Sequence, residues 1–170
     1  MLQIELRQCH SDVGMRARQC VTVQAECVEE LLAVITSEIA DASAAEFNVT
    51  IAGNKWPTDV RTDLLTFLEQ LKDTLLGLQT VPFRQATLDF YEQGIERVIE
   101  LIREDDMLRV KIIGAVPEVN AKMPYDSFRE MVRALWSTFN SLAEEWSPES
   151  VTSSMFSAWR SEVDTLIRCK

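Results

Sequence analysis

Two strands and the turn between them are contained in IELIREDDMLRVKI, residues 99–112. A turn at Asp105-Asp106 sets Glu100 opposite Lys111 and gathers the apolar residues of both strands on one face, namely Ile99, Leu101, Leu108, Val110 and Ile112. In a competing interpretation, residues 95–102 form one face of a helix in a strand–helix–strand unit. The hairpin is favoured because the next strand begins almost at once, at Met107. A strand over 87–91 would complete a three-stranded meander.

The hydrophobic pattern predicts the other elements on either side of this hairpin. Alternation of apolar and polar residues indicates strands over 2–6, 21–25 and 47–52, with a turn at 11–14. Apolar residues at helical spacing predict helices over 28–41, 58–78, 125–145 and 147–168. Pro57-Thr58-Asp59 is predicted to start the second helix and Ser147-Pro148-Glu149 the last, because these residues suit a first helical turn. Residues 116–124 are predicted to be a loop.

These elements predict an α+β fold of short, mostly antiparallel strands covered by three to four helices. A chain of 170 residues fits a single domain, 1–170. Internal duplication is the alternative, because aligning Pro57-Thr-Asp59 with Pro124-Tyr-Asp126 also aligns the apolar stripes of the two long helices. The related half-units would then be 1–80 and 84–146, followed by the C-terminal helix 147–168.

The chain is acidic, with 27 Asp and Glu against 17 Lys and Arg and a net charge of −10. Such a charge disfavours direct binding to nucleic acid, which relies on clustered Lys and Arg. It suits either solubility or attraction to a basic partner. No signal-peptide pattern and no apolar run of about 18 residues occurs, so we expect a cytoplasmic protein that does not bind membranes.

Half of this net charge lies in residues 89–106, where seven acidic residues accompany Arg97 and Arg103. The segment could be a solvated sheet face, a docking surface for a basic partner, or a carboxylate site for a divalent metal or a glycoside. The docking hypothesis names as contact residues Glu96, Glu100, Glu104, Asp105 and Asp106. It adds Trp146 as the best candidate for an exposed aromatic anchor, whereas the other interpretation of the tryptophans is core packing.

The cysteines Cys9, Cys20, Cys27 and Cys169 are predicted to be free thiols, with no bound metal and no cofactor. One zinc ion held by Cys9, His10, Cys20 and Cys27 is the alternative. Adjacent strand residues point to opposite faces, which disfavours Cys9 and His10 as ligands of one ion. For the same reason His10 is interpreted as an ordinary surface histidine and not as a catalytic base.

Acidity, size and the lack of a catalytic motif favour a non-enzymatic protein that binds and neutralises a basic protein. The most concrete form is a toxin-immunity or inhibitor protein that covers the positive cleft of a toxin or nuclease domain. One alternative is a secretion chaperone, which a dimeric mass in solution would favour; the sequence leaves the oligomeric state open. Another is a small hydrolase or transferase, which requires a pocket where two carboxylates of 89–106 converge.

Overall fold

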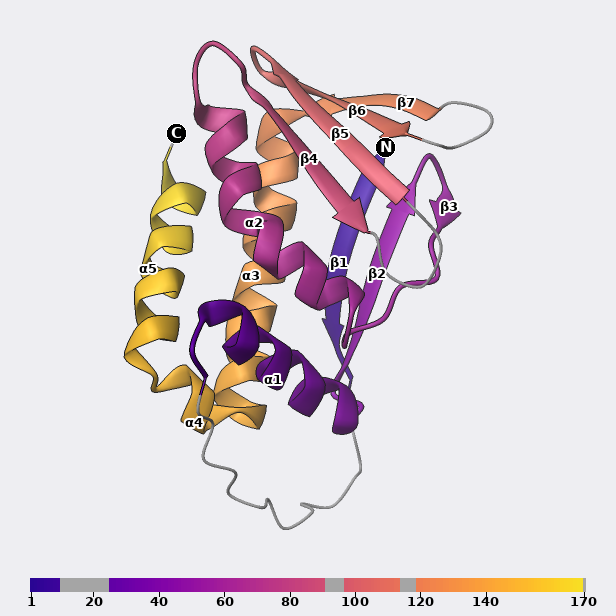
Figure 1. Ribbon diagram of the computed structural model, residues 1–170. Helices are drawn as coiled ribbons and strands as arrows, with labels where there is room; N and C mark the ends of the chain where they lie inside the picture. Colours follow the sequence, from indigo (N-terminus) through magenta and orange to yellow (C-terminus); the bar gives the residue numbers. More distant parts are fainter. Residues whose placement is uncertain (10–24, 91–96, 114–118, 170) are drawn as a thin grey trace.

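The computed structural model describes residues 1–9, 25–90, 97–113 and 119–169, which form two sheets and five helices (Figure 1). The first sheet has the order β1-β2-β3, formed by Leu2–Gln8, Ala45–Ile51 and Asn54–Lys55. The second has the order β4-β5-β6-β7, formed by Gln85–Phe90, Arg97–Glu104, Met107–Ile113 and Val119–Pro124. The helices are α1 (Val28–Asp41), α2 (Asp63–Gln79), α3 (Tyr125–Trp146), α4 (Pro148–Val151) and α5 (Ser154–Arg168). The predicted α+β class is confirmed.

The hairpin β5-β6 has the predicted register. Glu104 faces Met107, Glu100 faces Lys111, and Ile99 faces Ile112. The five apolar residues predicted to share a face are all buried, whereas the residues between them are not. Residues 97–104 are therefore strand, and the helical interpretation of 95–102 is wrong. The strand predicted over 87–91 is β4, which begins two residues earlier than predicted.

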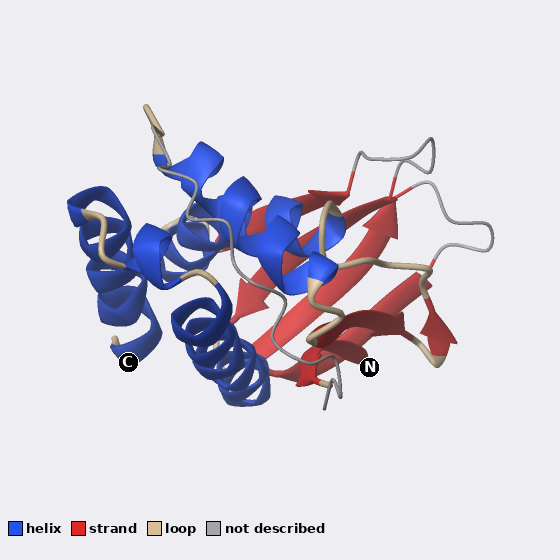
Figure 2. Ribbon diagram, turned by 90° about the horizontal axis from the view of Figure 1, so that it is seen from below, coloured by secondary structure: helices blue, strands red, loops and turns tan. Residues whose placement is uncertain are grey.

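Each long helix packs on a sheet of the other predicted half-unit. Helix α2 of 1–80 covers the second sheet, and helix α3 of 84–146 packs on the first. Figure 2 shows the helices on one side of the molecule and the strands on the other. Helix α2 packs along β4, where the Gln70 side-chain amide pairs with both the N–H and the C=O of Asp89, at 2.8 and 3.0 Å. Helix α3 packs along β1, and the Ile4 N–H donates to the Met131 sulfur. Buried residues of both half-units thus form a shared hydrophobic cluster.

Two helix predictions need correction. Helix α2 begins at Asp63 and not at Thr58, because the Asp59 carboxylate accepts the Thr62 N–H and the Asp63 carboxylate accepts the Asp59 N–H, which closes a separate turn ahead of the helix. The last helix is not continuous. It is divided into α4 and α5 because Ser153, whose hydroxyl accepts the Met155 N–H, caps a new helix.

One loop prediction also needs correction, and one strand prediction is left open. Residues 119–124 were assigned to a loop, yet they form the edge strand β7, which pairs with β6 along its length. Pro124 is tolerated there because an edge strand needs only half of its N–H groups for pairing. The strand predicted over 21–25 and the turn at 11–14 lie outside the described residues, except for Ala25, which belongs to no strand.

None of the described helices has the length and apolar character needed to cross a membrane.

Candidate functional site

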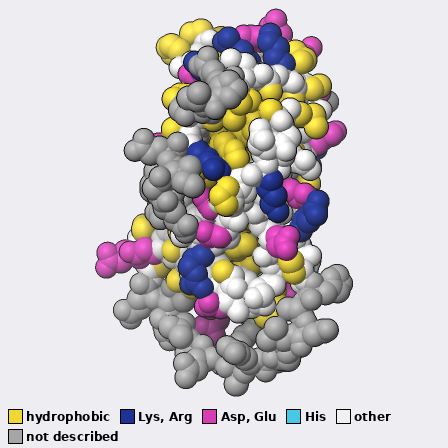
Figure 3. Space-filling model, turned by 90° about the vertical axis from the view of Figure 1, so that its right-hand side faces the viewer, with side chains coloured by type: hydrophobic (Ala, Val, Ile, Leu, Met, Phe, Trp, Pro, Cys, Tyr) yellow, Lys and Arg dark blue, Asp and Glu magenta, His cyan; other side chains and the backbone are white. Residues whose placement is uncertain are grey.

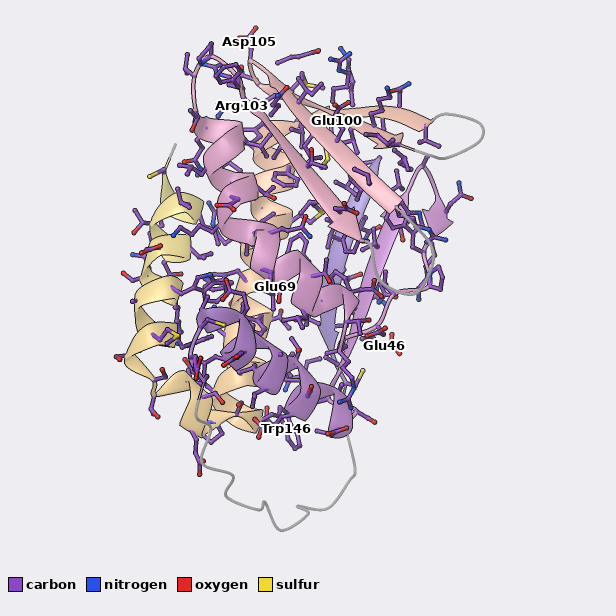
Figure 4. All side chains as sticks on the ribbon, in the orientation of Figure 1. Glu46, Glu69, Glu100, Arg103, Asp105 and Trp146 are labelled. Carbon is purple, nitrogen blue, oxygen red and sulfur yellow. The ribbon has the colours of Figure 1, made fainter. Side chains whose placement is uncertain are left out.

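Three acidic residues of the docking hypothesis, Glu104, Asp105 and Asp106, are exposed at the tip of the β5-β6 hairpin. Asp105 occupies the turn with a positive φ of 54° and lies 3.8 Å from the Arg84 guanidinium. Asp106 is also exposed, and its carbonyl accepts the Tyr125 N–H, which ties the turn to the start of α3. Figure 4 shows Asp105 at the end of the molecule where the hairpin turns. The tip is thus acidic, but it lies beside Arg84, which comes from the loop between α2 and β4.

Glu104 is held by two cationic side chains. Its carboxylate lies 3.1 Å from the Lys122 ammonium and 3.3 Å from the Arg109 guanidinium. The hydrogen bond from Lys122, its charge and the charge of Arg109 lower the pKa of Glu104. Glu104 lies on β5, Arg109 on β6 and Lys122 on β7. The positive charge that pairs with Glu104 therefore comes from strands outside residues 89–106.

Glu100 also has a basic neighbour on this sheet. Glu100 projects from the outer face of β5, directly opposite Lys111 on β6. On this face the acids Asp89, Glu100 and Glu104 belong to β4 and β5, whereas the bases Arg109, Lys111 and Lys122 belong to β6 and β7. Figure 3 shows Lys and Arg interspersed with Asp and Glu on the side of the molecule where β3 and β7 lie in Figure 1. The outer face is therefore charge-balanced.

The two arginines of the segment stack on aromatic rings at opposite ends of β5. Arg103 lies over Tyr125 at 3.9 Å and Arg97 over Trp56 at 4.8 Å. Both side chains point from the inner face of the sheet, because they share the alternation of the buried Ile99 and Leu101. Cation–π contacts hold these guanidinium groups away from the outer face.

The structure does not bring Trp146 together with the hairpin acids. Trp146 ends α3 at the opposite end of the molecule from Asp105 (Figure 4), where it is half-buried against the core. This placement agrees better with packing than with the exposed anchor that the sequence suggested. Glu96, the remaining predicted contact residue, lies outside the described residues.

A second acidic region escaped the sequence analysis. Between Ala25 and Asn54 the chain contains six acidic residues and no Lys or Arg, and all six are exposed: Glu26, Glu29, Glu30, Glu38, Asp41 and Glu46. Five of them lie on α1 or directly before it, and α1 has no basic residue in its last turn. Counting charge over the helix as well as over 89–106 would have found this region.

The acidic region continues onto the carboxyl end of α3. Helix α1 contacts both α3 and α4, and Figure 1 shows α1, α4 and the carboxyl end of α3 at the end opposite the hairpin turn. Glu144 and Glu145 occupy the last turn of α3, where Glu144 pairs with Arg160 and Glu145 accepts a hydrogen bond from Gln8. Helix carboxyl ends carry partial negative charge, so the carboxyl end of α1 adds to the potential of Glu38, whereas Asp41 forms an ion pair with Arg61.

The described residues also bear on the metal and enzyme hypotheses. Cys9, Cys27 and Cys169 are free thiols, and no group of three or more His, Cys, Asp and Glu side chains in the described ranges could hold a metal ion. Cys20 and His10, which complete the zinc alternative, lie outside those ranges.

A shallow hollow of about 580 Å³ lies beside β2 and is lined by residues that include Cys9, Glu46 and Trp56. No carboxylate of 89–106 lines this hollow.

Comparison with protein-family models, curated proteins and solved structures finds no match to this chain.

Proposed function

We propose that this protein is a non-enzymatic, acidic binding protein that neutralises a basic partner protein, most concretely a toxin-immunity or inhibitor protein of the cytoplasm. One observation carries the proposal: six exposed acidic residues and no basic residue occur between Ala25 and Asn54. A field of one sign attracts a partner of the opposite sign and accelerates association. The basic partner is a protein such as a toxin or nuclease domain.

The exposed face of α1 suits this role better than the hairpin acids. Among the described residues, ion pairs engage Glu104 twice, and none engages Glu29 or Glu38. A basic partner that approaches Glu104 would compete with Lys122 and Arg109 for the carboxylate and would be repelled by both. A partner that approaches Glu29 and Glu38 meets no such competition. We therefore place the first contact on α1 and treat the hairpin tip as a secondary contact.

Association kinetics can separate the two acidic regions. A basic protein captured by the wild-type chain would be tested against E29K/E30K/E38K and against E104K/D105K/D106K, with far-UV circular dichroism as the check on folding. We expect the α1 variant to associate at least about tenfold more slowly at low salt and to show a flatter salt dependence. The hairpin variant should show a smaller change.

Two results would contradict the proposal. One is an association rate and salt slope of E29K/E30K/E38K equal to those of the wild type. The other is a captured partner that carries no excess of positive charge, because steering by α1 would then have nothing to act on. A larger effect in the hairpin variant would keep a basic partner but move the docking surface to the second sheet.

A further inference from the structure

No helix among the described residues packs on the outer face of the second sheet. Its inward residues, among them Leu88, Ile99, Leu101 and Val110, are buried under α2 and α3. None of its described outward residues is buried. Four of these are apolar, namely Val98, Ile102, Met107 and Ile113, and the last two are 38% and 46% exposed. These side chains place exposed apolar area among the charged residues of the face.

The charges of this face are divided between its two halves. The acids Asp89, Glu100 and Glu104 stand on β4 and β5, and the bases Arg109, Lys111 and Lys122 stand on β6 and β7. Such a surface is complementary to itself when it is turned over about an axis parallel to the strands. That rotation sets the β4-β5 half of one copy over the β6-β7 half of the other. An axis in the sheet plane perpendicular to the strands would set like charges over each other.

We infer that this face pairs with the same face of a second copy, about a two-fold axis that runs parallel to the strands between β5 and β6. Closed, symmetric dimers use the same patch on both subunits, as this arrangement requires. The rest of the chain supports the choice of face, because a protein with a net charge of −10 repels its own copy wherever acids are unbalanced. The balanced outer face is where two copies can approach without that repulsion.

The β7 edge of this sheet is poorly suited to pairing with another strand. The Tyr125 N–H donates to the Asp106 carbonyl, so odd-numbered residues of β7 bond to β6 and even-numbered ones turn their main chain outward. The outward positions are thus Asn120, Lys122 and Pro124. Proline offers no N–H, and lysine on an edge strand discourages the addition of another strand.

The size of the face sets the strength expected of the dimer. Four strands spaced by about 4.8 Å and seven residues rising about 3.4 Å each give a planar area of roughly 460 Å². Stable interfaces bury about 800 Å² on each partner. The contact is therefore smaller than a standard interface. We expect a dissociation constant of the dimer in the range of about 10–100 μM.

Sedimentation velocity of the full chain tests the inference. Between about 1 and 300 μM, the wild type should shift from the monomer to the dimer mass. Ile113→Glu should remain monomeric at every concentration, because it buries a charge in the contact. Val81→Glu is the matched control, since Val81 is 67% exposed on the loop before β4, and it should dimerise like the wild type. Circular dichroism confirms that each variant is folded.

A charge-reversal mixture tests the direction of the axis. E100K/E104K makes the face largely positive and R109E/K111E makes it largely negative, so each variant alone should lose at least about tenfold in dimer affinity. Mixing the two should restore a heterodimer, because opposite faces then meet. A wild type that stays monomeric at all concentrations overturns the inference, as does an Ile113→Glu variant that dimerises normally. A dimer that is unaffected by either charge variant overturns the proposed axis. A confirmed dimer would also favour the secretion chaperone among the functional alternatives.

Discussion

The outer face of the second sheet and the exposed face of α1 have similar numbers of acids, but the sheet face is charge-balanced and the helix face is acidic. On the sheet, each acid stands on a strand whose neighbours come from other parts of the chain, and those neighbours bring Arg109, Lys111 and Lys122 alongside. On the helix, most exposed neighbours come from the same short stretch of sequence, which contains no basic residue, although Asp41 at its end pairs with Arg61. An acidic run therefore indicates an acidic surface more reliably in a helix than in a strand.

The outer face of the second sheet differs from α1 in this way only if it is exposed to solvent in the monomer. Leu101→Ala and Ile102→Ala test it, since these neighbours on β5 point to opposite faces. Leu101 is 0% exposed, so its truncation should lower the free energy of unfolding by about 2–5 kcal/mol. Ile102 is only half-buried, and its truncation should cost about 1 kcal/mol or less. Urea unfolding at a protein concentration below about 1 μM gives both values, because the weak dimer proposed above is dissociated there.

Equal losses in the two variants would contradict this assignment, because the outer face would then be packed against something. A small loss in Leu101→Ala would be equally damaging, since the assigned alternation of β5 would be wrong.

The sequence predicted the hairpin well because three signals agreed on it. The acidic turn, the apolar alternation and the Glu100–Lys111 pair all specify the same register, and a shift by one residue would turn Ile99 and Leu101 toward solvent. The strand β7 gave no such agreement, since its run from Val119 to Pro124 is short and ends in proline. The start of α2 was misplaced because Asp59 suits an N-cap, yet its side chain closes a separate turn before the helix.

The candidate site was harder to predict than the fold. The predicted hairpin register set Glu100 opposite Lys111, as observed, and summing charge along 89–106 identified Glu104, Asp105 and Asp106, which are exposed. It could not foresee Lys122, which reaches Glu104 only because 119–124 is a strand and not the predicted loop. The packing of α2 on β4 and of α3 on β1 joins segments remote in sequence, and no local pattern specifies it.

The exposed face of α1 can be tested by neutralising one acid at each end of the helix. Glu29 lies in the first turn, where negative charge is favourable, and Glu38 lies near the carboxyl end, where it is not. We expect Glu29→Gln to lower and Glu38→Gln to raise the free energy of unfolding, each by about 0.3–1 kcal/mol at low salt. Thermal unfolding with and without added salt measures both, and the difference should shrink as salt is added.

A rise in stability for both substitutions would be informative about the charge on α1. It would mean that mutual repulsion among the α1 acids outweighs the helix dipole, and hence that the acidic field is stronger than the helix ends alone imply.

The acid titration of Glu104 tests whether the outer face of the second sheet is charge-balanced. We expect this change to be the smallest of those described. Lys122 and Arg109 hold the pKa of Glu104 below its usual value, so its carboxylate stabilises the fold at neutral pH. Because the folded-state pKa is lowered, this contribution is present above the unfolded-state pKa and is lost as the pH falls through the folded-state pKa. NMR titration of the Glu104 carboxyl should show its midpoint rising in Lys122→Gln. The rise should be smaller in Arg109→Gln, since the hydrogen bond and charge of Lys122 are the larger causes. An unchanged midpoint in Lys122→Gln would show that the strands do not share charge as the structure has it, and the contrast with α1 would then disappear.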